Sequence, residues 1–209
     1  MREAVVLVHG IWMPGWEMVV LRRRLEACDY TCHQFRYHSV GYSPQRNALR
    51  LAAFLSTIEA DIIHLVAHSL GGIVVLHLFE RDPMQRPGRI LLLGTPLNGS
   101  SLARRLYGIP LTRPLLGKSV RRGLLGDVPP WKGGRELGMI AGSRSIGSGA
   151  LLFGGLERPN DGTVALSETR SSVLDAHLTV PHSHMGMLLS SRVAKAACSF
   201  LRTGEFVVE

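Results

Sequence analysis

The stretch 62–79 constrains the fold of this chain more than any other. Residues 61–67 are mostly apolar and rich in β-branched side chains, which is typical of a strand buried on both faces of a parallel sheet. Residues 73–79 are apolar on every side of a helix, so that helix is expected to lie inside the protein. The stretch therefore predicts a buried strand, a sharp turn at Ser69 and a buried helix.

The turn itself, Ala67-His68-Ser69-Leu70-Gly71, fits the nucleophile-elbow pattern G-x-S-x-G with alanine at the first glycine position. In this motif the serine takes strained backbone angles, so we expect positions 67 and 71 to approach each other closely and to need small residues. Gly72 then allows the helix to pack close to the sheet. The plain alternative is that Ser69 only caps the amino end of the helix.

The rest of the chain alternates apolar strands with amphipathic helices, which predicts an α/β fold with a parallel, helix-covered sheet. A chain of 209 residues with 45% hydrophobic content can bury one core, so we expect a single domain over 1–209. The expected fold is a mostly parallel six-stranded sheet with helices on both faces. The further strands are expected at 4–8, 31–40, 89–94, 138–142 and 173–180, the further helices at 18–28, 44–58 and 185–201, and a glycine- and serine-rich loop at 143–155.

The cysteines and the lack of a long apolar run bear on location and cofactors. No run approaches the roughly 18 apolar residues of a membrane span, and the first residues are too short and acidic for a signal peptide, so a cytoplasmic protein is expected. Cys28, Cys32 and Cys198 fit reduced, mostly buried thiols. The spacing of Cys28, Cys32 and His33 does not suit a metal, and neither a metal nor a cofactor is expected.

Positive charge is concentrated in one segment. Residues 100–135 hold eight lysines and arginines against Asp127 alone, or +7 of a formal net charge of +8. Leucines broken by prolines and glycines predict short helices and loops there, a lid-like insertion. A basic, apolar insertion can lie against an anionic membrane surface as a peripheral contact, and the alternative is a solvated basic face. Nucleic acid is not an expected partner, because no recognised binding module accompanies the charge.

A serine hydroxyl becomes a strong nucleophile only with a base and an orienting carboxylate, which follow an elbow serine in the order acid, histidine. His184, between the last strand and the closing helix, is the favoured base, and His182 is its close competitor. Asp161 begins a turn after a strand and is the favoured acid, with Asp175 as the fallback. A plain Asn-Asp-Gly turn is the alternative role for Asp161.

Two backbone amides are expected to stabilise the oxyanion that forms when the serine attacks. One is the N–H of Leu70 at the amino end of the helix, and the other is the N–H of Ile11 in the loop after the first strand. Trp12, Met13 and Trp16 follow in that loop and are expected to form an apolar rim for an acyl chain, unless they simply pack in the core.

Taken together, the chain resembles small bacterial lipases of the α/β-hydrolase superfamily over essentially its whole length. The resemblance implies a minimal α/β-hydrolase fold with Ser69 as nucleophile, Asp161 as acid and His184 as base, and with Ile11 and Leu70 as oxyanion donors. Leu97 stands where larger lipases often have a histidine, and no acidic cluster matches their calcium site. The segments that carry the resemblance are Val8-His9-Gly10-Ile11, Ala67-His68-Ser69-Leu70-Gly71-Gly72, Gly94-Thr95-Pro96-Leu97-Asn98-Gly99-Ser100, Asn160-Asp161-Gly162-Thr163-Val164 and Ser183-His184-Met185-Gly186-Met187-Leu188.

The expected activity is hydrolysis of carboxylic esters of small molecules or lipids, with an apolar acyl group, through an acyl-enzyme on Ser69. The same residues would serve a thioesterase or an acyltransferase. The alternative, from another functional class, is a protein with a hydrolase fold that only binds a ligand. Such a binding module would be recognised by the absence of the serine, the acid or the histidine.

Overall fold

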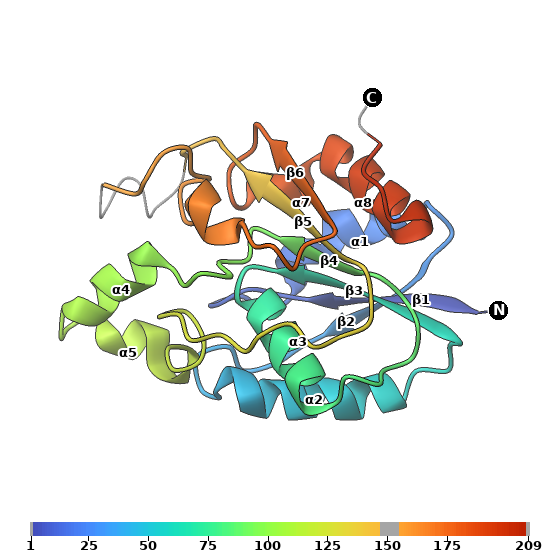
Figure 1. Cartoon of the computed structure of the whole chain (residues 1–209), viewed down its shortest axis with the longest axis horizontal. Helices are drawn as coiled ribbons and strands as arrows, with labels where there is room; N and C mark the ends of the chain where they lie inside the picture. The colour runs from blue at the N-terminus through green and yellow to red at the C-terminus, as the bar shows by residue number, and fades with distance from the viewer. Residues whose placement is uncertain (1, 147–154, 208–209) are drawn as a thin grey trace.

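The strands lie in one parallel sheet with the order β2-β1-β3-β4-β5-β6 (Figure 1). The computed structural model describes residues 2–146 and 155–207, and six strands are found within them. The prediction of a six-stranded parallel sheet is thus confirmed. The strands are β1 Glu3–Val8, β2 Thr31–Phe35, β3 Ile62–His68, β4 Ile90–Leu93, β5 Leu137–Gly142 and β6 Ala176–Val180.

Helices cover both faces of the sheet, as expected (Figure 1). Alternation along β1 shows the two faces: Val6 and Val8 belong to the core under α2 and α3, whereas Val5 and Leu7 belong to the core under α1 and α8. The helices are η1 Trp16–Met18, α1 Val19–Glu26, α2 Pro44–Ser56, α3 Leu70–Arg81, α4 Ser101–Gly108, α5 Arg113–Leu116, η2 Gly117–Ser119, η3 Leu166–Thr169, α7 Gly186–Leu189 and α8 Ser191–Thr203.

Several boundaries differ from the prediction for local reasons. β2 ends at Phe35 instead of residue 40, because the amide of Tyr37 donates to Nε2 of His9 rather than to a strand. The closing helix is two helices, since the side chain of Ser190 caps α8 by accepting from the amide of Val193. The loop expected over 143–155 lies mostly outside the described residues.

The cysteine expectation is wrong for two of the three residues. Cys28, just after α1, and Cys198 in α8 form a disulfide across 170 residues of sequence, because the two helices pack side by side. Only Cys32 is a free thiol, and burial raises its pKa to about 12. The cysteines therefore give no support to a cytoplasmic location.

The strand order places one crevice at the carboxyl edge of the sheet. From β1 the chain proceeds to β2 on one side and later to β3 on the other, so the direction of winding switches between β1 and β3. Ligands of open α/β sheets bind outside the carboxyl ends of strands at such a switch point. Here β1 leads into His9, Gly10 and Ile11, and β3 leads into Ser69.

The basic segment 100–135 connects β4 to β5 as the short helices α4, α5 and η2 with irregular loops, as its sequence predicts. Leu102, Leu106 and Leu116 from this segment pack on Leu70 and Ile73 at the start of α3. The segment therefore lies directly over the elbow turn. None of the helices within the described residues is long and apolar enough to cross a membrane.

Gly71→Ala is expected to destabilise the fold. A Cβ at position 71 would lie 2.4 Å from the carbonyl oxygen of Val8, the last residue of β1, whose backbone is fixed between β2 and β3. Overpacking of this kind costs about 1–3 kcal/mol, so urea unfolding should shift to clearly lower concentration. Gly108→Ala is the matched control, since a Cβ there meets nothing within 4 Å. A Gly71→Ala protein as stable as the Gly108→Ala protein would contradict this.

Candidate active site

Ser69 is the single residue between β3 and α3, and its backbone has a strained conformation. Its φ is 54° and its ψ is −122°, a region that a residue with a side chain rarely adopts. Surrounding hydrogen bonds hold it there: its amide donates to the carbonyl of Leu93, and its carbonyl accepts from Gly72 N–H and Thr95 Oγ1. The geometry is that of a nucleophile elbow rather than of an ordinary helix cap, because the Ser69 side chain makes no capping bond.

The structure shows a further steric reason for the small residues. The atoms nearest to a Cβ on Gly71 would be the carbonyl oxygens of Val8, at the end of β1, and of His9, in the loop after it. The close approach of positions 67 and 71 stays a prediction. A Cβ on Gly72 would collide with the side chain of Thr95. The role of Thr95 in fixing the elbow was not apparent from the sequence, where it is only a common loop residue.

Asp161 and His184 form a buried carboxylate–imidazole pair. Nδ1 of His184 lies 2.6 Å from Oδ2 of Asp161, and the two side chains are 7% and 2% exposed. The other carboxylate oxygen of Asp161 accepts from the amides of Thr163 and Val164 at 2.9 and 2.7 Å, which fixes the carboxylate plane. The backbone amide of His184 also donates to the carbonyl of Asp161. This pairing is the chemistry expected of a general base and its orienting acid.

The competing residues are engaged elsewhere. Nε2 of His182 lies 2.9 Å from the hydroxyl of Ser190, and Nε2 of His177 lies 3.1 Å from that of Thr169. Asp175, the fallback acid, accepts from the amide of Leu137 at the start of β5, which is the opposite edge of the sheet. Among the candidates from the sequence, the structure thus brings together Asp161 and His184.

His68 connects the elbow to His184, a contact that the sequence did not reveal. The ring centroids of His68 and His184 lie 4.5 Å apart, and Nε2 of His68 lies 3.3 Å from the carbonyl of His184. Burial and the neighbouring His184 hold the pKa of His68 well below its ordinary value, which favours the neutral ring. Within the described residues, neither Ser69 Oγ nor Nε2 of His184 has a hydrogen-bond partner. Catalytic hydrogen bonds often tighten only when substrate is bound.

The loop after β1 is held rigid by His9 rather than by packing alone. Nε2 of His9 accepts from Tyr37 N–H and its Nδ1 contacts the carbonyl of Gly10 at 2.8 Å, while its ring stacks on Tyr37. Burial lowers the pKa of His9, which favours this neutral arrangement. The amides of Ile11 and Leu70 donate to no described residue, and they lie at the carboxyl ends of β1 and β3. They are therefore free to donate to an oxyanion.

Two of the three rim residues line a cavity. Trp12 and Met13 border a space of about 570 Å³ together with Tyr37 and Val40. Trp12 is 55% exposed, and its Nε1 donates to the carbonyl of Leu115 in α5. Trp16 is outside this cavity and lies 4.6 Å from the guanidinium of Arg36. Trp12 and Trp16 are exposed and therefore do not pack in the core, whereas Met13 is partly buried.

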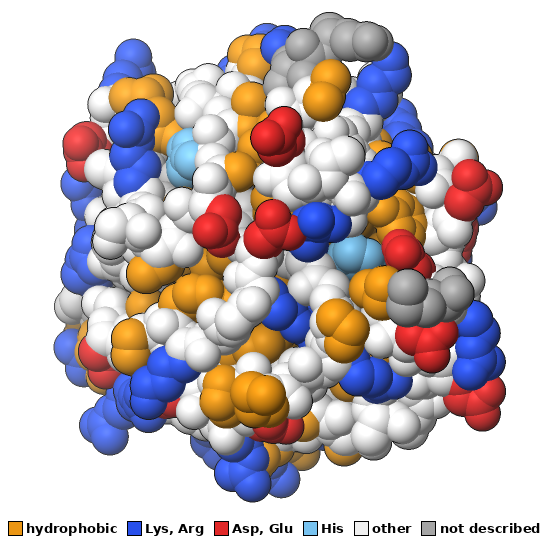
Figure 2. All heavy atoms as spheres, turned by 45° about the vertical axis from the view of Figure 1, so that its right-hand side comes forward, with side chains coloured by type: hydrophobic (Ala, Val, Ile, Leu, Met, Phe, Trp, Pro, Cys, Tyr) orange, Lys and Arg blue, Asp and Glu red, His pale blue; other side chains and the backbone are white. Residues whose placement is uncertain are grey.

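A cavity of about 900 Å³ lies at the amino ends of the strands, away from Ser69. Basic and acidic side chains are interspersed on the face of the molecule shown in Figure 2. The charged residues that line the cavity are Arg2, Arg89, Arg135 and Arg202 against Glu3, Asp29, Glu59 and Glu136. With balanced charge and no candidate nucleophile beside a base, this cavity is not the catalytic site.

The parallel sheet and the strained serine after its central strand define an α/β hydrolase. The chain belongs to the Alpha/beta hydrolase family, whose sequence profile matches residues 5–196. The predicted superfamily and fold class are therefore confirmed.

Individual relatives are more distant. A putative carbamate hydrolase, RutD, of Pantoea ananatis is 33% identical over 116 residues, which span 51% of this chain but only 42% of that protein. The mature lipase BlEst2 of Bacillus licheniformis superimposes with a TM-score of 0.77 at 21% identity, over 98% of this chain and 93% of that one. The metagenomic carboxyl esterase MGS0156 gives 0.63 at 19% identity, over 88% and 64%. The two structures share the fold with this chain.

Proposed function

We propose that the protein is a serine hydrolase that cleaves carboxylic esters, with Ser69 as nucleophile, His184 as base and Asp161 as acid. The observation that carries the proposal is the buried 2.6 Å pair of Asp161 and His184, whose imidazole packs on the ring of His68, together with the φ of 54° at the next residue, Ser69. A serine that merely capped a helix would need neither the strain nor the neighbouring carboxylate–imidazole pair.

The reaction has two halves. Ser69 Oγ attacks the ester carbonyl while Nε2 of His184 takes the hydroxyl proton, and the amides of Ile11 and Leu70 stabilise the oxyanion. His184 then returns that proton to the departing alcohol as the bond from the acyl carbon to the alcohol oxygen breaks. Water attacks the acyl-enzyme with the same residues in the same roles, which releases the acid and restores Ser69.

The substrate class follows from the surroundings of the oxyanion loop. The cavity beside this loop is lined by Trp12, Met13 and Tyr37, which support an apolar acyl group. The basic side chains of Arg36 and Arg50 also line it. We expect esters of small molecules or lipids with an apolar acyl group. Carbamates, named for the relative in Pantoea ananatis, would react through the same attack on a carbonyl carbon.

The test is covalent labelling followed by a substrate panel. A fluorophosphonate probe should add one adduct to the folded protein, and peptide mapping should place it on Ser69, because only an activated serine reacts. Rates on p-nitrophenyl esters of increasing chain length then give the acyl preference, and added alcohol, acyl thioester and carbamate separate an acyltransferase, a thioesterase and a carbamate hydrolase. No adduct on the folded protein would favour the binding module instead.

A further inference from the structure

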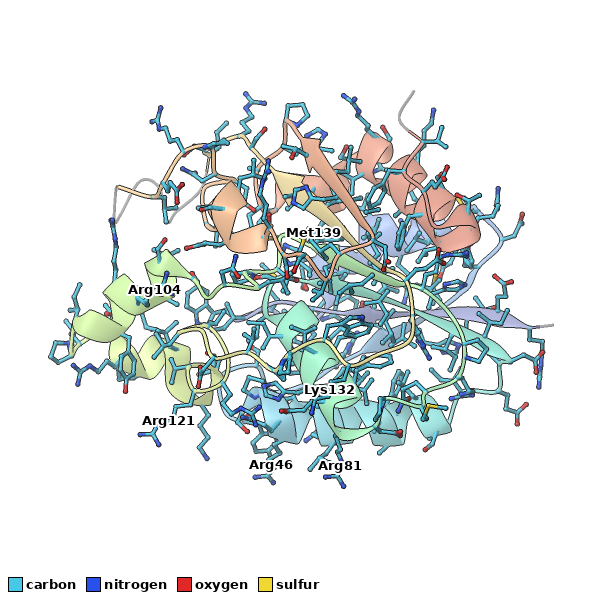
Figure 3. All side chains as sticks on the ribbon, viewed as in Figure 1. Arg46, Arg81, Arg104, Arg121, Lys132 and Met139 are labelled. Atoms are coloured by element: carbon cyan, nitrogen blue, oxygen red, sulfur yellow. A yellow bond between two sulfur atoms is a disulfide. The ribbon has the colours of Figure 1, made fainter. Side chains whose placement is uncertain are left out.

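A cavity of about 720 Å³ opens between α5 and the start of α2, and its charged residues are all cations. Arg113, Lys118 and Arg121 line it, with Tyr107 and Gln45, and no carboxylate is among the lining residues. We call it the basic pocket. Figure 3 shows Arg121 and Arg46 of α2 projecting from the same lower edge of the molecule.

The three cations of the basic pocket lack counter-charges, unlike their neighbours in the same segment. Arg122 pairs with Glu80, and Arg104 lies 4.0 Å from Glu168. Within residues 2–146 and 155–207, no such ion pair reaches Arg113, Lys118 or Arg121. Arg113 also donates through Nε to the carbonyl of Tyr107 and lies over the Tyr107 ring, so it has neutral partners but no counter-charge. Three cations without a carboxylate partner around one concavity favour a ligand with negative charge, and a phosphate group fits that chemistry.

Large apolar side chains project from the same helices. Leu111, in the turn between α4 and α5, is 87% exposed, and Leu115 and Ile109 are 52% and 45% exposed. The indole of Trp12 joins them through its bond to the carbonyl of Leu115. Exposed leucine, isoleucine and tryptophan beside arginine and lysine are the composition of a surface that enters the boundary between lipid headgroups and acyl chains. A free soluble phosphate would account for the cations but not for Leu111.

This surface adjoins the candidate active site. Leu106 and Leu116, on the inner side of α4 and α5, pack against Leu70, whose amide is a proposed oxyanion donor. Ile11, the other donor, is packed against the same cluster. A lipid surface that met Leu111 and the basic pocket would therefore lie next to the entrance of the site, where an apolar ester could leave the membrane for Ser69.

We propose that α4, α5 and the turn between them dock on an anionic phospholipid membrane, with lipid phosphates in the basic pocket and Leu111 in the apolar layer. The proposal deepens the proposed function, on which it rests for the nature of the substrate, by naming the membrane as the place where that substrate is met. The occupant is the lipid headgroup, since it alone accounts for both the charge and the apolar side chains.

The test measures vesicle binding by the full chain, independently of turnover. The protein should sediment with vesicles of equal parts phosphatidylglycerol and phosphatidylcholine, and at least about tenfold less with phosphatidylcholine alone. The triple variant Arg113→Gln, Lys118→Gln, Arg121→Gln should bind about a hundredfold more weakly, at roughly tenfold or less per cation. Leu111→Ser should weaken binding about tenfold.

A matched control removes the same charge from another surface. Arg192, Lys195 and Arg202 line a smaller cavity beside α8, on the opposite side of the molecule from α5 (Figure 1). Their triple glutamine variant should bind within about threefold of the unaltered protein, once circular dichroism has shown that all variants are folded. Equal loss in both triple variants would show attraction by net charge alone and overturn the proposal, as would wild-type protein that ignores anionic vesicles.

Ser69→Ala separates the two proposals. This variant should bind vesicles as the unaltered protein does, because docking does not involve the hydroxyl. In the unaltered protein, vesicle binding without any esterase activity would support docking and refute the hydrolase. Esterase activity without vesicle binding would do the reverse.

Discussion

Ser69→Ala is expected to lower kcat on any ester substrate by about 10⁴-fold or more while leaving the fold intact. The loss is large because alanine has no hydroxyl to form the acyl-enzyme, so Asp161 and His184 have nothing to activate. The methyl group fits the space, since Ser69 is buried and its Oγ makes no hydrogen bond within the described residues. The measurement is steady-state hydrolysis of a p-nitrophenyl ester, with thermal unfolding to show that the variant is folded.

Ser100→Ala provides the control for this experiment. Ser100 is another buried serine at the carboxyl edge of the sheet, and its hydroxyl caps α4 by accepting from the amide of Ala103. Loss of this hydroxyl should lower the free energy of unfolding by about 1 kcal/mol and leave kcat within severalfold of the value for the unaltered protein. If Ser69→Ala retained most of the esterase activity, Ser69 could not be the nucleophile and the proposed function would be wrong.

Much of the fold could be predicted because hydrophobic patterning reports burial directly. Successive apolar residues in β3 and all-round apolar residues in α3 identified the centre of the sheet, and both are buried as predicted. The end of β2 could not be predicted, since it depends on a hydrogen bond between Tyr37 and His9 from distant parts of the chain. The Cys28–Cys198 disulfide was missed for the same reason: it depends on how α1 meets α8.

The candidate site, too, could be predicted where it depends on positions along the chain, and not where it depends on packing between distant segments. The place of each residue in the predicted elements ranked Asp161, in a turn after a strand, above Asp175, and His184, in the loop before the closing helix, above His182. The structure pairs Asp161 with His184. No pattern in the sequence indicated that the His68 ring would pack on His184. That contact joins residues 116 positions apart in the chain, so it depends on how the loop after β6 packs against the end of β3.

Asp161→Asn is expected to lower kcat by about 10⁴-fold although the change is nearly isosteric. Oδ1 of Asp161 accepts from the amides of Thr163 and Val164, and an asparagine oxygen would keep those bonds. The asparagine NH₂ would then face Nδ1 of His184, where Oδ2 now accepts. Two donors cannot face each other, so the imidazole would carry its proton on Nε2. In that tautomer His184 has no lone pair to receive the proton of Ser69, and attack stops.

Asp175→Asn is the matched control, because it makes the same chemical change in the fallback acid. Asp175 accepts from the amide of Leu137 at the far edge of the sheet, and an asparagine oxygen can replace it there, so activity should stay within severalfold. Fluorophosphonate labelling measured as a rate adds a readout independent of substrate: it should slow for Asp161→Asn and not for Asp175→Asn. Slower labelling of Asp175→Asn, with unchanged labelling of Asp161→Asn, would identify Asp175 as the acid. Equal, small effects in both would mean that the carboxylate at 161 serves the turn and that His184 is oriented without it.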